Sequence, residues 1–202
     1  MKASRAVAVV LAVVLIVAGT GAYLVMTGAG QAVTVTTSTT VTSTVTASQT
    51  GISTYSACFS PGGSCASQLI ALISRANSSI HVMIYEFSNT DIANALVKAK
   101  QRGVDVKIIM DGSEAESQNV GAVAVLSQGG VPLKDYTPLN GILHDKVAII
   151  DGYIVVTGSY NWSYSADNFN DENMLVLNSA TLAAQYQTDF QTLWNQTSTL
   201  PG

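Results

Sequence analysis

The sequence predicts an α/β domain in which a mixed β-sheet carries helices on both faces. Residues 79–111 have the pattern of strand, helix and strand, and strands joined by a crossover helix lie parallel. Asp151-Gly152 stands between two β-branched runs, which is the strongest short-range signal for an antiparallel hairpin. A last amphipathic helix over residues 182–194 should pack back on the sheet.

The separate elements follow from periodicity and from end signals. Apolar residues at helical spacing begin after a candidate N-cap at Ser64, and a second such run ends at Gly103. Short apolar runs between the helices predict buried strands. In chain order we expect a helix at 64–76, a strand at 79–87, a helix at 89–103, a strand at 104–111, a helix at 119–128, a strand at 131–136, the hairpin, a strand at 172–177 and the helix at 182–194.

The N-terminal segment is apolar. Residues 6–26 carry no charge, and Lys2 and Arg5 precede them. A run of 21 residues can span a membrane, and positive charge before it favours a cytoplasmic N-terminus and an exported remainder. Small residues at 28–30 leave a cleaved signal peptide as the alternative. We expect residues 1–28 to be a transmembrane helix or a signal peptide, and the rest to be membrane-anchored outside the cytoplasm or secreted.

Residues 29–53 should form a stalk between this segment and the folded domain. The run 33–50 is almost wholly Thr, Ser and Val, a low-complexity composition that favours an extended stalk over a packed strand. The folded domain is expected over residues 54–202, which is long enough for a sizeable core. Its two cysteines, Cys58 and Cys65, lie close in sequence, and in an exported domain such a pair suggests a disulfide. With no further thiol or histidine nearby, a zinc site is not expected.

The folded domain is acidic. Of nine Lys and Arg residues, Lys2 and Arg5 lie in the N-terminal segment, which leaves seven against thirteen Asp and Glu and a net charge of −6. Nonspecific binding of nucleic acid depends mainly on Lys and Arg at phosphates, so this balance argues against a generalist DNA binder. We interpret the local cluster of Lys98, Lys100 and Arg102 as the solvated face of a helix.

The hairpin should place a set of polar side chains on one face of the sheet. A two-residue loop at Asp151-Gly152 pairs Ile150 with Tyr153 and fixes the register outward from there. Such a set suits a tetrahedral oxyanion such as phosphate better than a core, where each polar group needs a partner. Because directly opposed residues share a face, the expected set is His144, Lys146, Thr157, Ser159 and Asn161.

These residues also form one continuous sequence pattern. It reads His144-x-Lys146, four residues, Asp151, six residues, Gly158-Ser159-x-Asn161, and Glu172-Asn173 eleven residues after Asn161. The pattern resembles the HKD signature of the phospholipase D superfamily, with no departure in spacing. The similarity covers roughly residues 55–195, and the upstream part resembles the small single-motif members, the bacterial endonucleases and the mitochondrial cardiolipin hydrolases.

The resemblance implies a phosphodiesterase that works without a metal or another cofactor. In this family one histidine attacks phosphorus to form a phosphohistidine, a second histidine protonates the leaving oxygen, and water releases the phosphate ester. By residue match, His144 is the nucleophile or the acid, and Glu172 orients the histidine. Lys146 and Asn161 hold nonbridging oxygens, and Ser159 assists them.

Two members of the signature, Asp151 and Gly158, should be structural. The hairpin pattern places Asp151 in the turn rather than at the phosphate. The remaining histidine, His81, lies among apolar residues of a strand, and we interpret it as structural as well. Because one histidine per chain cannot be nucleophile and acid at once, we expect a homodimer that shares its active site across a twofold interface.

Three functions remain open from the sequence. An exported or membrane-anchored nuclease acting on nucleic acid is expected first, because the motif is single and the domain small. A phospholipase D or cardiolipin hydrolase acting on membrane phospholipids is the alternative, which the acidic domain and the expected tether support. A noncatalytic surface binding protein is a minor alternative, since a binding module has no need of the complete catalytic set.

Overall fold

The structure is a computed structural model that describes residues 51–117 and 121–199. The expected anchor or signal peptide at 1–28 and the stalk run at 33–50 lie outside the described residues. Within the described ranges, no helix combines the length and apolarity needed to cross a membrane. By its internal contacts, Gln49–Gly202 is one compact unit.

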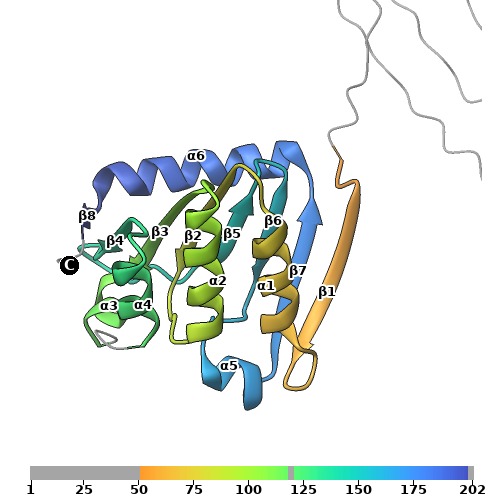
Figure 1. Ribbon diagram of the computed structural model, residues 1–202, viewed down its shortest axis with the longest axis horizontal. Helices are drawn as coiled ribbons and strands as arrows, with labels where there is room; N and C mark the ends of the chain where they lie inside the picture. The colour runs from red at the N-terminus through yellow and green to blue at the C-terminus, as the bar shows by residue number, and fades with distance from the viewer. Residues whose placement is uncertain (1–50, 118–120, 200–202) are drawn as a thin grey trace, which may run out of the picture. The chain divides into compact units, whose positions relative to one another are not determined.

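The described residues form an eight-stranded sheet in the order β1-β7-β6-β5-β2-β3-β4-β8 (Figure 1). The parallel strands are β2 (Ser79–Ile84), β3 (Asp105–Asp111) and β4 (Leu133–Tyr136). The antiparallel part consists of β1 (Thr54–Ser60), β5 (Lys146–Ile150), β6 (Ile154–Gly158), β7 (Glu172–Asn178) and β8 (Ser198–Thr199). The mixed sheet confirms the predicted fold class.

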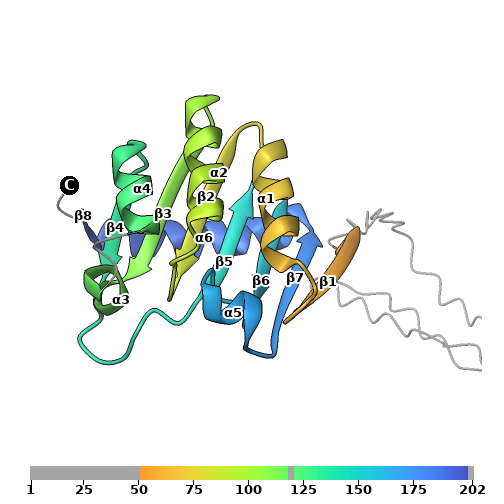
Figure 2. The ribbon, with the colours of Figure 1, turned by 60° about the horizontal axis from the view of Figure 1, so that its bottom comes forward.

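Helices cover both faces of this sheet, as predicted. One face carries α1 (Cys65–Arg75), α2 (Thr90–Gln101) and α4 (Ala122–Gln128), and the other carries α6 (Ala180–Gln196) (Figure 2). Each side has its own buried apolar cluster, one including Leu69, Ile80 and Leu96, the other including Met83, Ile149 and Phe190. The described unit therefore has a complete core of its own, as a region that folds independently requires.

The helix ends test the capping signals. The Asn89 side chain accepts hydrogen bonds from the Asp91 and Ile92 N–H groups, so α2 begins with a side-chain cap. Ser64 does precede α1, but it does not cap the helix as expected. Its backbone is left-handed (φ 56°), and its side chain makes no hydrogen bond to the first turn. The start of α1 is instead tied to the end of β1 by a disulfide between Cys58 and Cys65.

Four described elements had no signal in the sequence, one of them the two-residue strand β8. Strand β1 lies at the sheet edge with most of its residues exposed, so it lacks the apolar alternation that marks a half-buried strand. The short helices α3 (Gly112–Ser117) and α5 (Tyr164–Asn168) are too brief for a helical period to show. Helix α3 follows β3 and helix α5 follows β6, and both helices lie at the edge of the sheet where β2 also ends (Figure 1).

The β5–β6 hairpin contains one residue more than predicted. The Tyr153 N–H donates to the Ile150 carbonyl at 3.2 Å, as an Asp-Gly turn requires, but Ile150 pairs with Ile154 in the ladder. Tyr153 is the extra residue, and its carbonyl accepts a hydrogen bond of 2.7 Å from the Ser179 N–H. The predicted register is therefore wrong by one, and Thr157, opposite Leu175, lies on the α6 face instead of the face of Lys146.

Asp151 lies at the tip of this hairpin, at the end away from His144. Its carboxylate accepts hydrogen bonds of 2.7–3.1 Å from the backbone N–H groups of Asn77, Ser78 and Ser79 and from the Ser78 hydroxyl. Burial alone would raise the pKa of Asp151, but these hydrogen bonds outweigh it and hold the pKa below its usual value. The carboxylate thus ties the hairpin to the segment between α1 and β2.

Replacing Asp151 should therefore destabilise the fold. We expect Asp151→Ala to lower the free energy of unfolding by about 2 kcal/mol at neutral pH, because the charged acceptor of several backbone N–H groups is lost. The Asp151 backbone is left-handed (φ 53°), a conformation that Asn also tolerates, and Asn keeps one acceptor oxygen, so the stability of Asp151→Asn should lie between those of wild type and Asp151→Ala.

The effect should disappear in acid. Because the folded-state pKa is lowered, the stabilisation is present above the unfolded pKa of about 3.9 and is lost as pH falls through the folded pKa. Urea unfolding of the three proteins at neutral pH and at a series of pH values descending from about 4 measures this difference. Equal midpoints at neutral pH would show that the hydrogen bonds at the hairpin tip do not stabilise the domain.

Candidate active site

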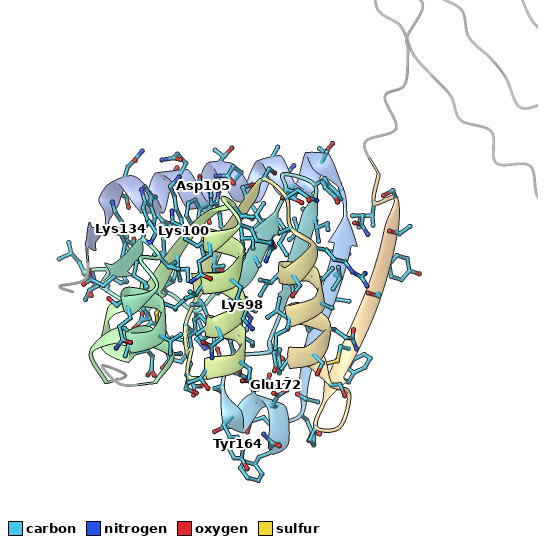
Figure 3. All side chains as sticks on the ribbon, viewed as in Figure 1. Lys98, Lys100, Asp105, Lys134, Tyr164 and Glu172 are labelled. Carbon is cyan, nitrogen blue, oxygen red and sulfur yellow. A yellow bond between two sulfur atoms is a disulfide. The ribbon has the colours of Figure 1, made fainter. Side chains whose placement is uncertain are left out.

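The predicted polar residues meet in one hollow of about 520 Å³. It lies where β5 and β7 begin and β6 ends, and Figure 3 shows Glu172 at that lower edge of the sheet. Asp151 and Thr157 do not belong to it. The lining residues are His144, Lys146, Gly158, Ser159, Asn161, Glu172 and Asn173.

His144 precedes β5, and hydrogen bonds to both of its neighbours fix its place. The Leu143 N–H donates to Asp111 Oδ2 at 2.7 Å, and the Asp145 carbonyl accepts from the Tyr85 N–H at 2.8 Å. The ends of β3 and β2 therefore hold the chain on either side of His144.

Asp111, which accepts the hydrogen bond from Leu143, was not predicted from any sequence motif. It is 2% exposed, and its other oxygen accepts hydrogen bonds from the Ser113 N–H and hydroxyl. The available signal was a carboxylate at the end of a buried parallel strand, where ligand sites of α/β proteins gather. Its contact with Leu143 joins residues 32 apart in sequence, which no local pattern reveals.

Lys146 is a buried cation beside the histidine. Its Nζ donates to the His144 carbonyl at 2.8 Å and lies 4.9 Å from the centre of the Tyr85 ring, and the Tyr85 and His144 rings are also 4.9 Å apart. Burial lowers the pKa of Lys146, and the carboxylates of Asp145, Glu172 and Glu86 offset this only in part. A bound anion would favour the charged ammonium again, so the site gains from taking up a phosphate.

Gly158 allows β6 and β7 to approach each other closely. Its φ of 147° lies outside the usual range of other residues, and a Cβ on it would lie 2.2 Å from the Asn173 carbonyl oxygen. That carbonyl accepts hydrogen bonds from the N–H groups of Ser159 and Tyr160. The Ser159 hydroxyl in turn accepts from the Asn173 backbone and side-chain N–H groups, at 3.1 and 3.2 Å, which leaves its own proton for a ligand.

Asn161 and Glu172 complete the hollow. Asn161 Oδ1 is buried and has no hydrogen-bond partner among the described residues. A buried acceptor left in this state costs about 1–3 kcal/mol, which a hydrogen-bond donor such as water would relieve, while the N–H donors of the same amide suit an anion in the hollow. Glu172 Oε1 accepts a hydrogen bond of 3.2 Å from Asn170 Nδ2, so a residue just before β7 orients its carboxylate.

The second histidine lies elsewhere. His81 contacts Gln187 Oε1 through Nδ1 at 2.7 Å and Asp105 Oδ2 through Nε2 at 3.3 Å, and its ring stacks on Phe190. Its ring is thus held between β3 and α6, and His81 does not line the hollow. Within residues 51–117 and 121–199, no group of three or more His, Cys, Asp or Glu side chains is placed to hold a metal ion.

Residues 69–194 match the family model described as cardiolipin synthase, PLD-like domain. The chain belongs to this phospholipase D-like family. The match includes every residue that lines the hollow.

The similarity to individual phospholipase D-like proteins is substantial but partial. A phospholipase D of Rickettsia prowazekii is 37% identical over 135 residues, 66% of this chain and 64% of the relative. A mitochondrial cardiolipin hydrolase of Xenopus tropicalis is 32% identical over 130 residues, 64% of this chain and 61% of the relative. The chain thus spans just under two thirds of the length of these two relatives. Among solved structures, the phospholipase D family member Nuc of Salmonella typhimurium matches with a TM-score of 0.68 and 35% identity, over 74% of this chain and 99% of that one.

The unpartnered Asn161 Oδ1 predicts that replacing Asn161 has opposite effects on folding stability and on anion binding. We expect Asn161→Ala to leave the free energy of unfolding unchanged or to raise it by about 1 kcal/mol, because a buried polar group without a partner is removed. The same change should weaken vanadate binding roughly tenfold, since one polar contact to the anion is lost.

Thermal unfolding and calorimetric titration with vanadate measure the two effects. Asn161→Asp is the matched control, because it keeps the size of the side chain but repels the anion, and it should bind least. If Asn161→Ala destabilises the protein and binds vanadate as well as wild type, Asn161 is a packing residue rather than a ligand of the anion.

Proposed function

We propose that the protein is a phosphodiester hydrolase in which His144 attacks phosphorus. The observation that carries this proposal is the set of groups around one hollow: an imidazole, a buried ammonium, a hydroxyl, an amide with an unpartnered oxygen and a carboxylate. These are the groups that attack on phosphorus and the stabilisation of its oxygens require. The membership of the chain in the phospholipase D-like family supports the same chemistry.

The proposed reaction has two steps. The His144 imidazole forms a bond to phosphorus as the bond to the leaving alcohol breaks, and a second acid gives that alcohol its proton. Water then attacks the phosphohistidine and gives its proton to the group that acted as the acid in the first step, His144 leaves with its electron pair, and the phosphate monoester is released. Lys146, Ser159 and Asn161 hold the nonbridging oxygens in both steps, and Glu172 stabilises the charged imidazole. Every group needed for these steps is a side chain, so we propose that the reaction requires no metal.

The second acid is proposed to come from a second copy of the chain. The hollow contains one histidine, and His81 is held between β3 and α6 instead. A twofold homodimer that brings two hollows together would supply one histidine as nucleophile and one as acid. The shared site would then be complete only in the dimer.

The substrate class has two candidates. A nucleic acid is favoured by the single motif and the small size of the domain. A phospholipid is favoured by the similarity to a phospholipase D and to a mitochondrial cardiolipin hydrolase, as those relatives are named. We further propose that the domain acts outside the cytoplasm, anchored through residues 6–26 or secreted, on the basis of that apolar sequence and the charges before it.

The histidine proposal predicts a large and selective loss of activity. With EDTA present, the protein should cleave bis(p-nitrophenyl) phosphate, and His144→Ala should lower kcat at least about a thousandfold, because the attacking group is removed. His81→Asn is the control and should retain wild-type turnover. The same pair should be compared on plasmid, RNA oligomer and phospholipid vesicles. Turnover that survives in His144→Ala, or that EDTA abolishes in wild type, would contradict the proposed chemistry.

The dimer proposal predicts that activity depends on protein concentration. Sedimentation should show a dimer at micromolar concentration, and turnover per chain should fall on dilution below the dissociation constant, because a monomer lacks the second histidine. An active, monodisperse monomer at nanomolar concentration would exclude a shared site.

A further inference from the structure

Three Asn-x-Ser/Thr triplets occur in the chain, and all of them lie in the folded domain. They are Asn77-Ser-Ser, Asn161-Trp-Ser and Asn195-Gln-Thr. In an exported protein this triplet is the acceptor for an N-linked glycan, which is bulky and hydrophilic and therefore requires a surface position. The surroundings of the three asparagines differ, and the difference separates acceptors from non-acceptors.

The triplet at Asn161 is closed in the folded domain. Asn161 lines the hollow, and its Oδ1 is buried. The other two residues of the triplet, Trp162 and Ser163, are each 1% exposed. The Ser163 hydroxyl also accepts a hydrogen bond from the Ala166 N–H as the cap of α5. A glycan on Asn161 would fill the hollow and displace buried side chains, so an active fold requires this asparagine to be unmodified.

Asn77 is exposed in the bend between α1 and β2. Its backbone N–H donates to the Asp151 carboxylate, which fixes the bend, and its side-chain Nδ2 donates to the Arg75 carbonyl at 3.0 Å. Nδ2 carries two hydrogens, and this contact uses one of them. A sugar that replaces the other hydrogen leaves the hydrogen bond to Arg75 in place. The local structure is therefore compatible with a glycan on this amide.

Asn195 is exposed in the last turn of α6, which ends at Gln196. Its Oδ1 accepts a hydrogen bond of 3.1 Å from Gln191 Nε2, and a glycan on Nδ2 leaves this oxygen unchanged. Thr197, the third residue of the triplet, has an extended backbone (φ −94°, ψ 155°) and lies outside the helix. The triplet thus lies at a helix end, where few helical hydrogen bonds are lost when a transferase binds the chain.

Both exposed asparagines lie at the edge of the sheet opposite the hollow. The parallel strands β2, β3 and β4 begin at that edge, and Asn77 lies two residues before β2. Asn195 follows Trp194, whose carbonyl accepts a hydrogen bond from Lys134 near the start of β4. Figure 3 shows Lys134 toward the upper end of the domain and Glu172, which lines the hollow, at the lower end. Glycans at the upper edge would leave the hollow open, and they would not obstruct a dimer in which two hollows face each other.

We propose that Asn77 and Asn195 are acceptors of N-linked glycans and that Asn161 stays unmodified. The proposal rests on the proposed location of the domain outside the cytoplasm, where a transferase carrying a polyprenyl-phosphate-linked oligosaccharide would meet it. In the reaction, the asparagine Nδ2 forms a bond to the anomeric carbon of the sugar as the bond from that carbon to the carrier phosphate breaks. The carrier phosphate leaves with the electron pair, and a base of the transferase takes the amide proton.

Mass spectrometry of the full-length chain, purified from the organism that makes it, tests the three sites together. Peptides that contain Asn77 or Asn195 should carry glycan mass, and peptides that contain Asn161 should carry none. Asn77→Gln and Asn195→Gln should each remove one glycan and one step in electrophoretic mobility. Thr197→Ala is the matched control, because it keeps Asn195 but destroys the triplet, and it should remove the same glycan as Asn195→Gln. A glycan on Asn161 in protein that hydrolyses bis(p-nitrophenyl) phosphate would contradict the proposal.

A reporter triplet in the expected stalk separates the glycan sites from the proposed location. Thr37→Asn creates an Asn-Ser-Thr triplet outside the folded domain. If this variant gains a glycan in the same organism while Asn77 and Asn195 carry none, the domain is exported and the two sites are rejected. If the reporter also stays bare, the glycan proposal is rejected, and protease digestion of intact cells decides the location. A domain that the protease cuts is exported without glycans, whereas a protected domain rejects the proposed location as well.

Discussion

The hydrogen bond from the Leu143 N–H to the buried Asp111 carboxylate is the constraint on which the candidate site depends. His144 lies before β5, outside regular structure, so no ladder holds it. Asp111 fixes the chain on one side of it, and the Tyr85 N–H fixes the Asp145 carbonyl on the other. Both supports come from the ends of central parallel strands, which the two apolar clusters hold rigidly. The imidazole is therefore positioned by the core of the domain and not by the segment that carries it.

A second constraint sets the opposite wall of the hollow. The absence of a side chain at Gly158 lets the Asn173 carbonyl come close enough to accept from two consecutive N–H groups, those of Ser159 and Tyr160. The same contact places the Ser159 hydroxyl between the two N–H donors of Asn173. One backbone approach thus orients three lining residues together, which explains why glycine and serine occur as a pair in the motif.

Local sequence patterns were sufficient to predict the layers of the fold and most of the residues that line the hollow. The parallel order of β2 and β3 and the helices on both faces follow from period and connection, and the HKD-like spacing brought together five of the seven lining residues with an expected role at the phosphate. The misplaced residue, Thr157, shows the limit. Its face depends on whether Tyr153 adds a residue to the hairpin, and that depends on the Ser179 N–H, 26 positions away in the chain. Asp111 was missed for the same reason, since Leu143 is distant in sequence, whereas β1 was missed because its exposed residues show no apolar alternation.

Helix α5 lies between two fixed points. Before it, the Trp162 carbonyl accepts from the N–H groups of Ser88 and Asn89, and after it the chain enters β7 at Glu172. Asn161 and Glu172 are thus held by contacts that do not involve the exposed face of α5. The segment therefore behaves as a replaceable module: substitutions on its outward face should leave the lining residues Asn161 and Glu172 in place.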